Sequence, residues 1–385
     1  MAHIALTAYD LENGGISRVA IYLANGFAAA GHRVSLILCT SAGERDADFK
    51  ARLTAGIDYI ALSDHYYASR AFGQVMQMRA FRAWLRTNRP DIVMGTANNI
   101  SWFSGMGLAA NRAIKARLYI KTTNPILREK DGKPITALRR WGYRKLFLKA
   151  EKTLTLSDAE SRILQTQFPA CAGRFRSVFN PYITDDFLHM QKPPANPSGK
   201  ARVPILVAIG RLAPQKNMTR LIQAFAIAKA KDAEQGGGPM AAARLIIAGE
   251  GPELGLLQQL ASDSGLPDAV EFPGFSDDIP ALLRRASLFI LSSNYEGLPA
   301  VVIEALGSNC PVVSTDCFPA AQELLTALPG CVVTERSAEA LADGILQAVA
   351  AWDASPDNEN EVLRKRALDY SLQSATDSHL RAMDL

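Results

Sequence analysis

The feature that most constrains the fold is a strand–helix alternation that runs through the chain twice, on either side of a proline-rich polar stretch. Short apolar segments alternate with longer amphipathic ones, which is typical of doubly wound parallel sheets. In the first half, strands are expected over 3–8, 32–39, 91–96, 117–122 and 152–157, and helices over 18–31 and 74–88 and from Ser157, with Ser17 as the N-cap of the first helix. In the second half, strands are expected over 203–210, 243–249, 269–274, 288–293 and 311–316, and helices over 219–231, 253–264 and 278–286 and from Pro299.

The stretch 185–204 has three prolines close together, polar surroundings and no periodicity, so we interpret 185–202 as an interdomain linker. The expected organisation is an α/β fold of two Rossmann-like doubly wound domains, 1–184 and 203–365, facing across a cleft. Residues 366–385 are expected to form a helical tail that packs back toward the N-terminal domain. Open α/β sheets bind ligands at the carboxyl ends of their strands, so the site should lie there.

Charge is distributed unevenly along the chain. The net charge is +4, yet residues 1–190 carry 26 Lys and Arg against 15 Asp and Glu, a net +11, and the remainder carries −7. A basic half indicates an anionic partner: a phosphate-bearing substrate, an anionic membrane surface or nucleic acid. Because this half lacks interleaved stacking aromatics and any recognisable binding motif, no nucleic-acid partner is expected.

Cysteine and histidine are scattered. The five cysteines form no CxxC pair and the five histidines show no paired-ligand spacing, so we expect reduced core thiols and no bound metal or cofactor. No stretch approaches the roughly 18 uninterrupted apolar residues of a membrane span. The N-terminus lacks the features of a secretory signal, so a cytoplasmic location is expected.

The loop Asn294–Pro299 carries the sharpest chemical signal. Pro299 suits a first helical turn, where its missing N–H costs nothing. The N–H groups around Gly297 and Leu298, together with the positive end of the helix dipole, form a site suited to a diphosphate.

Two glutamates eight positions apart accompany this loop. Glu304 lies about one and a half turns into the helix and leans toward its N-terminus, so its carboxylate can accept hydrogen bonds from two ribose hydroxyls. Glu296 in the loop can do the same for the hydroxyls of a sugar. The alternative is an exposed loop glutamate and an unrelated glutamate on a helix surface.

A second signal follows the first strand of the second half, where Gly210-Arg211 precedes Lys216-Asn217. A guanidinium and an ammonium at this edge can neutralise a diphosphate leaving group as its charge develops. A solvated basic loop is the alternative interpretation.

Two glycine-rich turns give weaker signals. Gly14 and Gly15, after Asn13 in the first strand–helix loop, allow backbone to approach a phosphate or a reacting sugar, although a tight turn explains them about as well. Gly249-Glu250-Gly251 follows another strand and does not satisfy GxGxxG, which argues against dinucleotide binding.

These motifs resemble those of the retaining glycosyltransferase family 4, which has the GT-B fold. Glu296 and Glu304 match its E-x7-E element, and Gly210, Arg211, Lys216 and Asn217 match its G-R-x4-K-[GN] element. The resemblance implies that Arg211, Lys216 and Glu296 are catalytic. It also implies that the donor contacts Gly14, Gly15, Gly210, Asn217, Gly249, Glu250, Gly251, Gly297, Leu298, Pro299 and Glu304.

One segment departs from the family pattern. Family members often place a donor-contacting His after the strand that here ends in Lys121, and Thr123 stands at that position. Lys121, Thr123 and Asn124 either replace the His as acceptor or sugar contacts or hold the turn before Pro125.

The stretch Arg139–Lys152 has cationic side chains on one side and apolar ones on the other when it is drawn as a helix. A domain helix with a solvated basic face explains this pattern. Peripheral docking on an anionic membrane surface is the second interpretation, and it would suit a lipid-linked acceptor.

Together these features predict a metal-independent, retaining transfer of a sugar from a nucleoside-diphosphate-sugar donor to a glycan or polyprenyl-diphosphate-linked acceptor. Synthesis of a bacterial surface polysaccharide or glycolipid is the expected setting, in the cytoplasm or peripherally on the inner face of the membrane. A nucleotide-sugar epimerase of the same fold and a catalytically degenerate binding partner are the alternatives.

Overall fold

The computed structural model describes residues 1–11, 14–43, 46–111, 113–127, 131–184, 187, 203–276, 278–354 and 361–385. Asn13 lies outside these ranges, as does the predicted linker 185–202 apart from Phe187. The chain divides into two compact units. The first consists of Met1–Tyr182 with Tyr370–Leu385, and the second of Ile183–Asp369.

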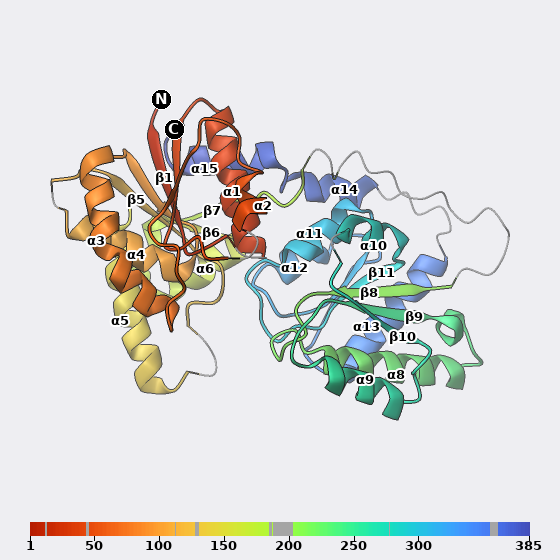
Figure 1. The fold of residues 1–385 in the computed structure, drawn as a ribbon. Coiled ribbons are helices and arrows are strands. Elements are labelled where there is room, and N and C mark those ends of the chain that lie inside the picture. Colours follow the sequence, from red (N-terminus) through yellow and green to blue (C-terminus); the bar gives the residue numbers. More distant parts are fainter. Residues whose placement is uncertain are drawn as a thin grey trace. The chain divides into compact units, whose positions relative to one another are not determined.

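The first unit is built on a parallel sheet with the strand order β3-β2-β1-β4-β5-β6-β7. Its strands are β1 (His3–Ala8), β2 (Arg33–Leu38), β3 (Asp58–Ala61), β4 (Ile92–Gly95), β5 (Arg117–Lys121), β6 (Lys152–Thr155) and β7 (Phe175–Ser177). Its helices are α1 (Gly15–Ala29), α2 (Asp46–Lys50), α3 (Arg70–Asn88), α4 (Asn98–Ala109), α5 (Lys133–Lys149), α6 (Asp158–Gln167), η1 (Pro169–Arg174) and α15 (Leu372–Ala382). Figure 1 shows α3, α4 and α5 together on one side of this sheet and α1 on the other.

The second unit repeats the plan with the strand order β10-β9-β8-β11-β12-β13. Its strands are β8 (Ile205–Ile209), β9 (Arg244–Ala248), β10 (Val270–Gly274), β11 (Leu288–Leu291), β12 (Val312–Thr315) and β13 (Val332–Thr334). Its helices are α8 (Met218–Glu234), η2 (Pro239–Ala242), α9 (Leu254–Asp263), α10 (Ile279–Arg285), α11 (Ala300–Gly307), α12 (Ala321–Leu325), α13 (Ala338–Asp353) and α14 (Glu361–Leu368). In Figure 1, α8 and α9 lie on one side of the sheet and α10 and α11 on the other.

The central strands are buried because helices cover both faces of each sheet. Every residue of β1 and β12 is buried, and so are those of β4 and β11. The strand order reverses between β1 and β4 in the first unit and between β8 and β11 in the second. These are the topological switch points at which doubly wound sheets bind ligands. The predicted fold of two Rossmann-like units is thereby confirmed, and the cleft between them stays a prediction.

The predicted central strands and their helices are present, with shifts of a few residues at their ends. The sequence did not predict β3, β7 and β13, which are only three or four residues long, nor several helices of both units. The predicted N-cap at Ser17 is wrong, because α1 begins at Gly15 and Ser17 is buried inside its first turn. The stretch Arg139–Lys152 is not one helix either, because α5 ends at Lys149 and Lys152 opens β6.

The C-terminal helix α15 belongs to the first unit. It packs on α1, where Gly26 leaves room for Thr376: a Cβ at Gly26 would lie 2.0 Å from the Thr376 hydroxyl oxygen. The adjoining helix α14 instead packs on α11 in the second unit.

Candidate active site

Two loops meet at the switch point of the second sheet, because β8 and β11 are neighbouring strands. The Asn294 backbone N–H, after β11, donates to the Gln215 carbonyl at 2.8 Å. The Asn294 side-chain amide donates to the Pro214 carbonyl at 2.8 Å, and the Asn217 amide donates to Asn294 Oδ1 at 3.1 Å. The two segments that carry the predicted motifs therefore form one continuous surface at the carboxyl edge of the sheet.

Lys216 and Glu296 form an ion pair at this junction. Lys216 Nζ lies 2.7 Å from Glu296 Oε1, and both side chains are largely buried. The Ser293 hydroxyl donates to the same oxygen at 2.7 Å, and the Gln215 amide donates to the other oxygen at 3.3 Å. Because its oxygens receive donors from both loops, the Glu296 carboxylate is held in one orientation.

Arg211 follows β8 directly and is exposed. Among the described residues, its guanidinium has neither a hydrogen-bond nor an ion-pair partner. The preceding Gly210 has φ 154°, and a Cβ there would lie 3.1 Å from Lys216 Cε. Gly210 therefore gives the Lys216 side chain the room to reach Glu296, while Arg211 remains available to an incoming anion.

Helix α11 begins directly after the Glu296 loop. Pro299 is its N-cap, with φ −72° and ψ 118°, and does not lie within the first turn as predicted. The N-cap side chain makes no capping hydrogen bond, so no side-chain cap competes with a ligand for the first N–H groups of the helix. Leu298 and Pro299 are buried and Gly297 is half-buried. Glu304 lies on this helix and is only 2% exposed.

The Gly249–Gly251 turn packs against the loop after β8. The Leu212 N–H donates to the Glu250 carbonyl at 2.8 Å. A Cβ at Gly249, which has φ 143°, would lie 2.0 Å from the Gly210 carbonyl oxygen, and one at Gly251 would lie 2.2 Å from that of Leu212. These two glycines are therefore required by the contact between neighbouring loops, whatever ligand Glu250 contacts.

Gly14 and Gly15 differ from those glycines. Both are exposed where α1 begins, at the carboxyl end of β1 in the first unit. An added Cβ at either position would meet nothing within 4 Å, and neither has the positive φ that favours glycine. Within the described part of the chain, packing therefore gives no reason for glycine here.

The segment after β5 divides into a buried and a partly accessible part. Lys121 is 1% exposed, and its Nζ lies 2.7 Å from His379 Nε2 of α15. Burial lowers the Lys121 pKa to about 7, although the nearby Glu160 carboxylate acts in the opposite direction. The predicted sugar or acceptor contact is wrong for Lys121, because its ammonium is enclosed inside the first unit.

Thr123 and Asn124 are half-buried in the turn that follows. The Thr123 N–H donates to Asn98 Oδ1 at 2.9 Å, and the Asn98 amide donates to the Asn124 carbonyl at 2.8 Å. Their backbone is thus fixed by α4, and their side chains remain candidate acceptor or sugar contacts.

Both halves of the chain match known families. Residues 194–368 match the family described as Glycosyl transferases group 1, and residues 13–186 match Glycosyltransferase Family 4. The chain belongs to the group 1, family 4 glycosyltransferases.

Individual relatives agree with this assignment. A GDP-mannose-dependent alpha-mannosyltransferase of Mycobacterium tuberculosis is 28% identical over 318 residues, 78% of this chain and 75% of that protein. An uncharacterized glycosyltransferase of Methanocaldococcus jannaschii is 28% identical over 205 residues, and the match spans about half of that relative, 48%. HepE of Anabaena, solved in complex with UDP and glucose, has a TM-score of 0.74 and 18% identity over 100% of both chains. The last of these is a likeness of fold, and it supports the GT-B class.

The structure adds residues of this glycosyltransferase that sequence reasoning missed. Arg220, on α8, donates to the Ser292 carbonyl at 2.8 Å and to Asn294 Oδ1 at 2.9 Å, so it clamps the loop that carries Glu296. Ser293 orients Glu296, and Asn98 fixes the turn after β5. Arg220 follows the matched Lys-Asn pair at helical spacing and was the easiest of the three to suspect, whereas the other two depend on contacts between distant segments.

Cys317 lies beside the candidate site, where its carbonyl accepts the Glu296 N–H at 2.7 Å. Burial raises the pKa of its thiol to about 11, so it is not a nucleophile near neutral pH. In the described ranges, no three His, Cys, Asp or Glu side chains gather in a way that could hold a metal ion. No helix among the described residues is both long and apolar enough to cross a bilayer.

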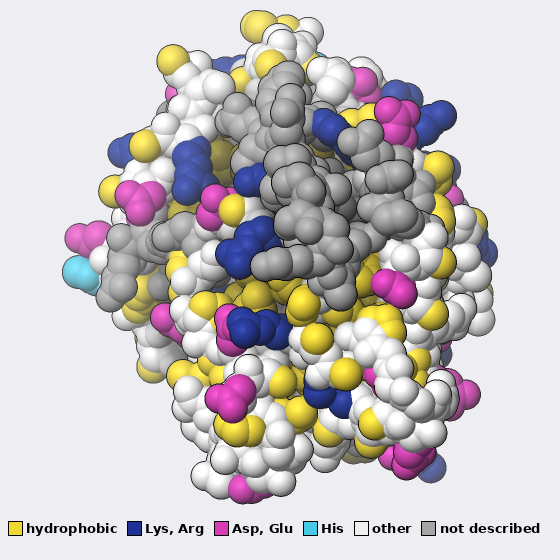
Figure 2. Space-filling model, turned by 90° about the vertical axis from the view of Figure 1, so that its right-hand side faces the viewer, with side chains coloured by type: hydrophobic (Ala, Val, Ile, Leu, Met, Phe, Trp, Pro, Cys, Tyr) yellow, Lys and Arg dark blue, Asp and Glu magenta, His cyan; other side chains and the backbone are white. Residues whose placement is uncertain are grey.

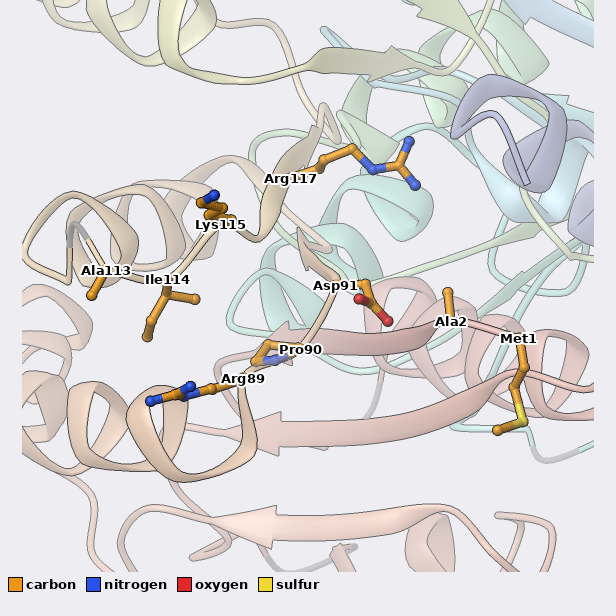
Figure 3. Close-up of a pocket in the computed structure, with 9 residues that line it drawn as sticks. All are labelled: Met1, Ala2, Arg89, Pro90, Asp91, Ala113, Ile114, Lys115 and Arg117. Carbon is orange, nitrogen blue, oxygen red and sulfur yellow. The ribbon is translucent and has the colours of Figure 1, made fainter.

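A cavity of about 620 Å³ lies at the amino edge of the first sheet, away from the switch point. Figure 3 shows that its cationic side chains, Arg89, Lys115 and Arg117, point in different directions, so they do not converge on one anion. On the face drawn in Figure 2, the Lys and Arg side chains are interspersed with Asp and Glu. Neither this cavity nor this face therefore indicates a charged partner.

Proposed function

We propose that this glycosyltransferase transfers a sugar from a nucleoside-diphosphate sugar to a glycan or polyprenyl-diphosphate-linked acceptor, with retention of the anomeric configuration and without a metal. The observation that carries the proposal is the joining of the β8 and β11 loops, which brings Lys216 against Glu296 beside the N-terminus of α11. A cation, a carboxylate and helical N–H groups at one sheet edge suit a diphosphate ester linked to a sugar.

The donor is assigned to the second unit. The Arg211 guanidinium, which has no partner among the described residues, can grip two phosphate oxygens, and Lys216 has an ammonium with three donors. One of these donors serves Glu296, and the others remain for the diphosphate. Glu304 would accept hydrogen bonds from the ribose, and Glu296 from a sugar hydroxyl.

The configuration is retained when the acceptor hydroxyl attacks the anomeric carbon on the face from which the leaving group departs. The bond from the anomeric carbon to the β-phosphate oxygen breaks, and the acceptor hydroxyl oxygen bonds to that carbon on the same face. The acceptor proton passes to the departing phosphate oxygen. Arg211, Lys216 and the helix N–H groups stabilise the negative charge left on the diphosphate, which is the role a metal ion fills in other enzymes.

The acceptor is assigned to the first unit. Its Gly14 and Gly15, which the family resemblance makes donor contacts, lie at the β1–β4 switch point without a packing reason for glycine. Thr123 and Asn124 lie after β5, at the same edge of the sheet. The expected setting is the synthesis of a surface polysaccharide or glycolipid. Peripheral association with the membrane stays a prediction, which flotation with anionic and neutral liposomes tests.

The base and sugar of the donor are the first matters to measure. The Mycobacterium tuberculosis relative is named for GDP-mannose, and the Anabaena protein was solved with UDP and glucose. A thermal-shift screen against UDP-, GDP- and ADP-sugars should give one series that stabilises the protein, because stabilisation follows affinity. The variant Glu304→Gln should lose most of that stabilisation, whereas Glu271→Gln, an exposed glutamate paired to Arg244, should keep it. Equal shifts in both variants would contradict the donor site.

Transfer itself is tested with the donor so identified. Sugar should move only when acceptor is present, the product should keep the anomeric configuration, and a chelator should not reduce the rate. An epimer formed from donor alone would favour the epimerase alternative. Donor binding without turnover against any acceptor would favour a degenerate binding partner.

A further inference from the structure

Helix α5 carries two apolar surfaces, of which the fold buries only one. Tyr143, Leu146 and Phe147 are buried in the first unit, as the sequence pattern predicts. Ile135, Leu138 and Trp141 are 51%, 66% and 57% exposed and follow one another at intervals of three residues. Side chains at this spacing are neighbours on a helix, so they form one apolar strip. Isolated exposed apolar residues are ordinary, but a continuous strip indicates a binding surface.

A pocket of about 460 Å³ adjoins this strip, between α5, the start of α4 and the segment after β5. Its walls include Trp102, Ile126, Leu138 and Trp141. Because α4 follows β4 and Ile126 lies shortly after β5, the pocket is at the carboxyl edge of the first sheet, where such sheets bind ligands. Its volume is within the range of small-molecule sites.

The aromatic wall is held rigidly. A Cβ at Gly142 would lie 3.1 Å from the Trp102 ring, so the glycine allows that ring to lie against α5. The ring meets Tyr143 edge to face, with 5.6 Å between centroids. A wall that is formed before the ligand arrives binds it at a lower entropic cost.

Several polar groups of the pocket already have partners. The Asn98 amide and carbonyl both bond to the Thr123–Asn124 turn. Asn99 Oδ1 accepts the Ile100 N–H at 2.9 Å, and Arg139 Nε lies 2.7 Å from the Asp131 carboxylate. A sugar would need free partners for its hydroxyls, whereas an apolar chain needs none, so these contacts favour an apolar occupant.

Cations flank the strip. Lys145 Nζ lies 3.8 Å from the centre of the Trp141 ring. Arg140, Arg144 and Lys149 are exposed, and in the described part of the chain their side chains have no ion-pair partner. An apolar strip with cations beside it and beyond its C-terminal end complements a molecule with an apolar chain and an anionic head.

We propose that this pocket and the strip Ile135–Leu138–Trp141 bind the lipid-phosphate portion of the acceptor. The chain lies along Trp102, Leu138 and Trp141, and the phosphate lies among Arg140, Arg144 and Lys145. The proposal rests on the proposed function and deepens it, because it selects a lipid-linked acceptor over a free glycan.

The test measures binding of farnesyl phosphate by titration calorimetry, with farnesol and inorganic phosphate as partial probes. Farnesyl phosphate should bind at least tenfold more tightly than either partial probe, because only it engages both the pocket and the cations. Leu138→Asp should weaken its binding at least tenfold. The matched control Leu256→Asp, at an equally exposed leucine of α9 in the second unit, should leave it unchanged. Both sites are exposed, so both variants should fold, and unchanged melting temperatures check this.

Equal affinity for farnesyl phosphate in the wild type and Leu138→Asp would overturn the proposal. So would loss of liposome flotation in Leu138→Asp with farnesyl phosphate binding intact, because the strip would then contact the membrane surface and not a single lipid. Nucleotide-sugar binding, measured on the same proteins, reports on the proposed function separately. It should be unaffected by Leu138→Asp whatever the lipid result.

Discussion

The Lys216 ammonium lies 2.7 Å from a Glu296 carboxylate oxygen, and this contact joins the loops after two neighbouring strands. Each group neutralises the other, so Arg211 and the N-terminus of α11 would supply the excess positive charge of the proposed site. A bound diphosphate would share the Lys216 ammonium with Glu296 and would not find it free. The two residues should therefore act as a unit.

Replacing Lys216 tests this unit first. We expect Lys216→Ala to lower kcat by on the order of 10²-fold or more, because it removes a preorganised charge donor and leaves the largely buried Glu296 carboxylate without its cation. Steady-state kinetics with the identified donor measure the effect. Lys231→Ala, which breaks an exposed ion pair to Asp343 in the same unit, is the control and should retain full activity.

The two residues are further tested by a double-mutant cycle. If Lys216 and Glu296 act together, Lys216→Ala with Glu296→Ala should be less impaired than the product of the two single effects. Fully multiplicative effects would show that the ion pair is incidental to turnover.

Ser293 should matter through Glu296 alone. Its hydroxyl donates to the oxygen that Lys216 also contacts. Because a hydrogen bond to a charged group contributes about 1.5–3 kcal/mol, we expect Ser293→Ala to lower kcat about ten- to a hundredfold with little change in the KM for the donor. Ser314→Ala removes a buried hydroxyl that donates to the Thr315 carbonyl and should leave kcat unchanged. A Ser293 variant with a raised KM and normal kcat would place the serine in donor binding instead.

Arg220 should link the stability of the second unit to its activity. Its guanidinium holds the Ser292 carbonyl and the Asn294 side chain. Arg220→Met should destabilise the unit by about 2 kcal/mol, because three hydrogen bonds, one of them long, are lost and their acceptors lie near the proposed site. A lower melting temperature and reduced kcat together would bear this out. Arg285→Met, at an exposed arginine of α10, should change neither quantity.

The sequence predicted the central strands of both sheets well, because strands buried on both faces are continuous apolar runs. It missed β3 and β13, which are too short and too exposed to show that pattern. It also misplaced the start of α1. Ser17 is a good N-cap by residue type, but the helix begins at Gly15 without a side-chain cap.

For the proposed site, residue types, spacing and the family resemblance pointed to Arg211, Lys216, Glu296 and Glu304, each after a recognisable strand, and their roles stay predictions. Spacing could not reveal that Lys216 pairs with Glu296, because the contact depends on β8 and β11 being neighbours in the sheet. The error at Lys121 has the same origin. Its partner His379 comes from the C-terminal helix, 258 residues away.

The buried Lys121 predicts a pH dependence of stability. Its folded pKa of about 7 lies below the 10.5 of an exposed lysine, so between these values the unfolded state binds more protons. Stability from this group therefore rises as pH rises from about 7 toward 10, by up to about 1.4 kcal/mol per pH unit.

Comparing wild type with Lys121→Met tests this slope, because the buried cysteines, whose raised pKa values act in the opposite direction, are common to both proteins. His379 and Glu160 face Lys121. The pKa of His379 in the folded protein is well below 6.5, so His379 makes stability depend on pH only below about pH 6.5. The urea midpoint of unfolding of the wild type, relative to that of Lys121→Met, should rise from pH 7 to pH 8 and again to pH 9. If the midpoints of the two proteins change with pH in parallel, Lys121 stays charged in the folded protein.

Substituting alanine for two glycines of α1 should change the melting temperature and the activity in opposite ways. Gly15 is the first residue of the helix, and an added Cβ would meet nothing within 4 Å. Gly15→Ala should therefore keep or slightly raise the melting temperature, because alanine is the better helix former by up to about 1 kcal/mol. Its transfer rate should fall at least tenfold if a phosphate or sugar approaches the backbone there.

Gly26→Ala supplies the contrast on the same helix. A Cβ at Gly26 would collide with the Thr376 hydroxyl, so α15 must shift and the melting temperature should fall by several degrees. Its transfer rate below the melting transition should be closer to wild type than that of Gly15→Ala. A stable Gly15→Ala protein with full activity would show that neither substrate comes near this turn, and Gly14 and Gly15 would then not be donor contacts.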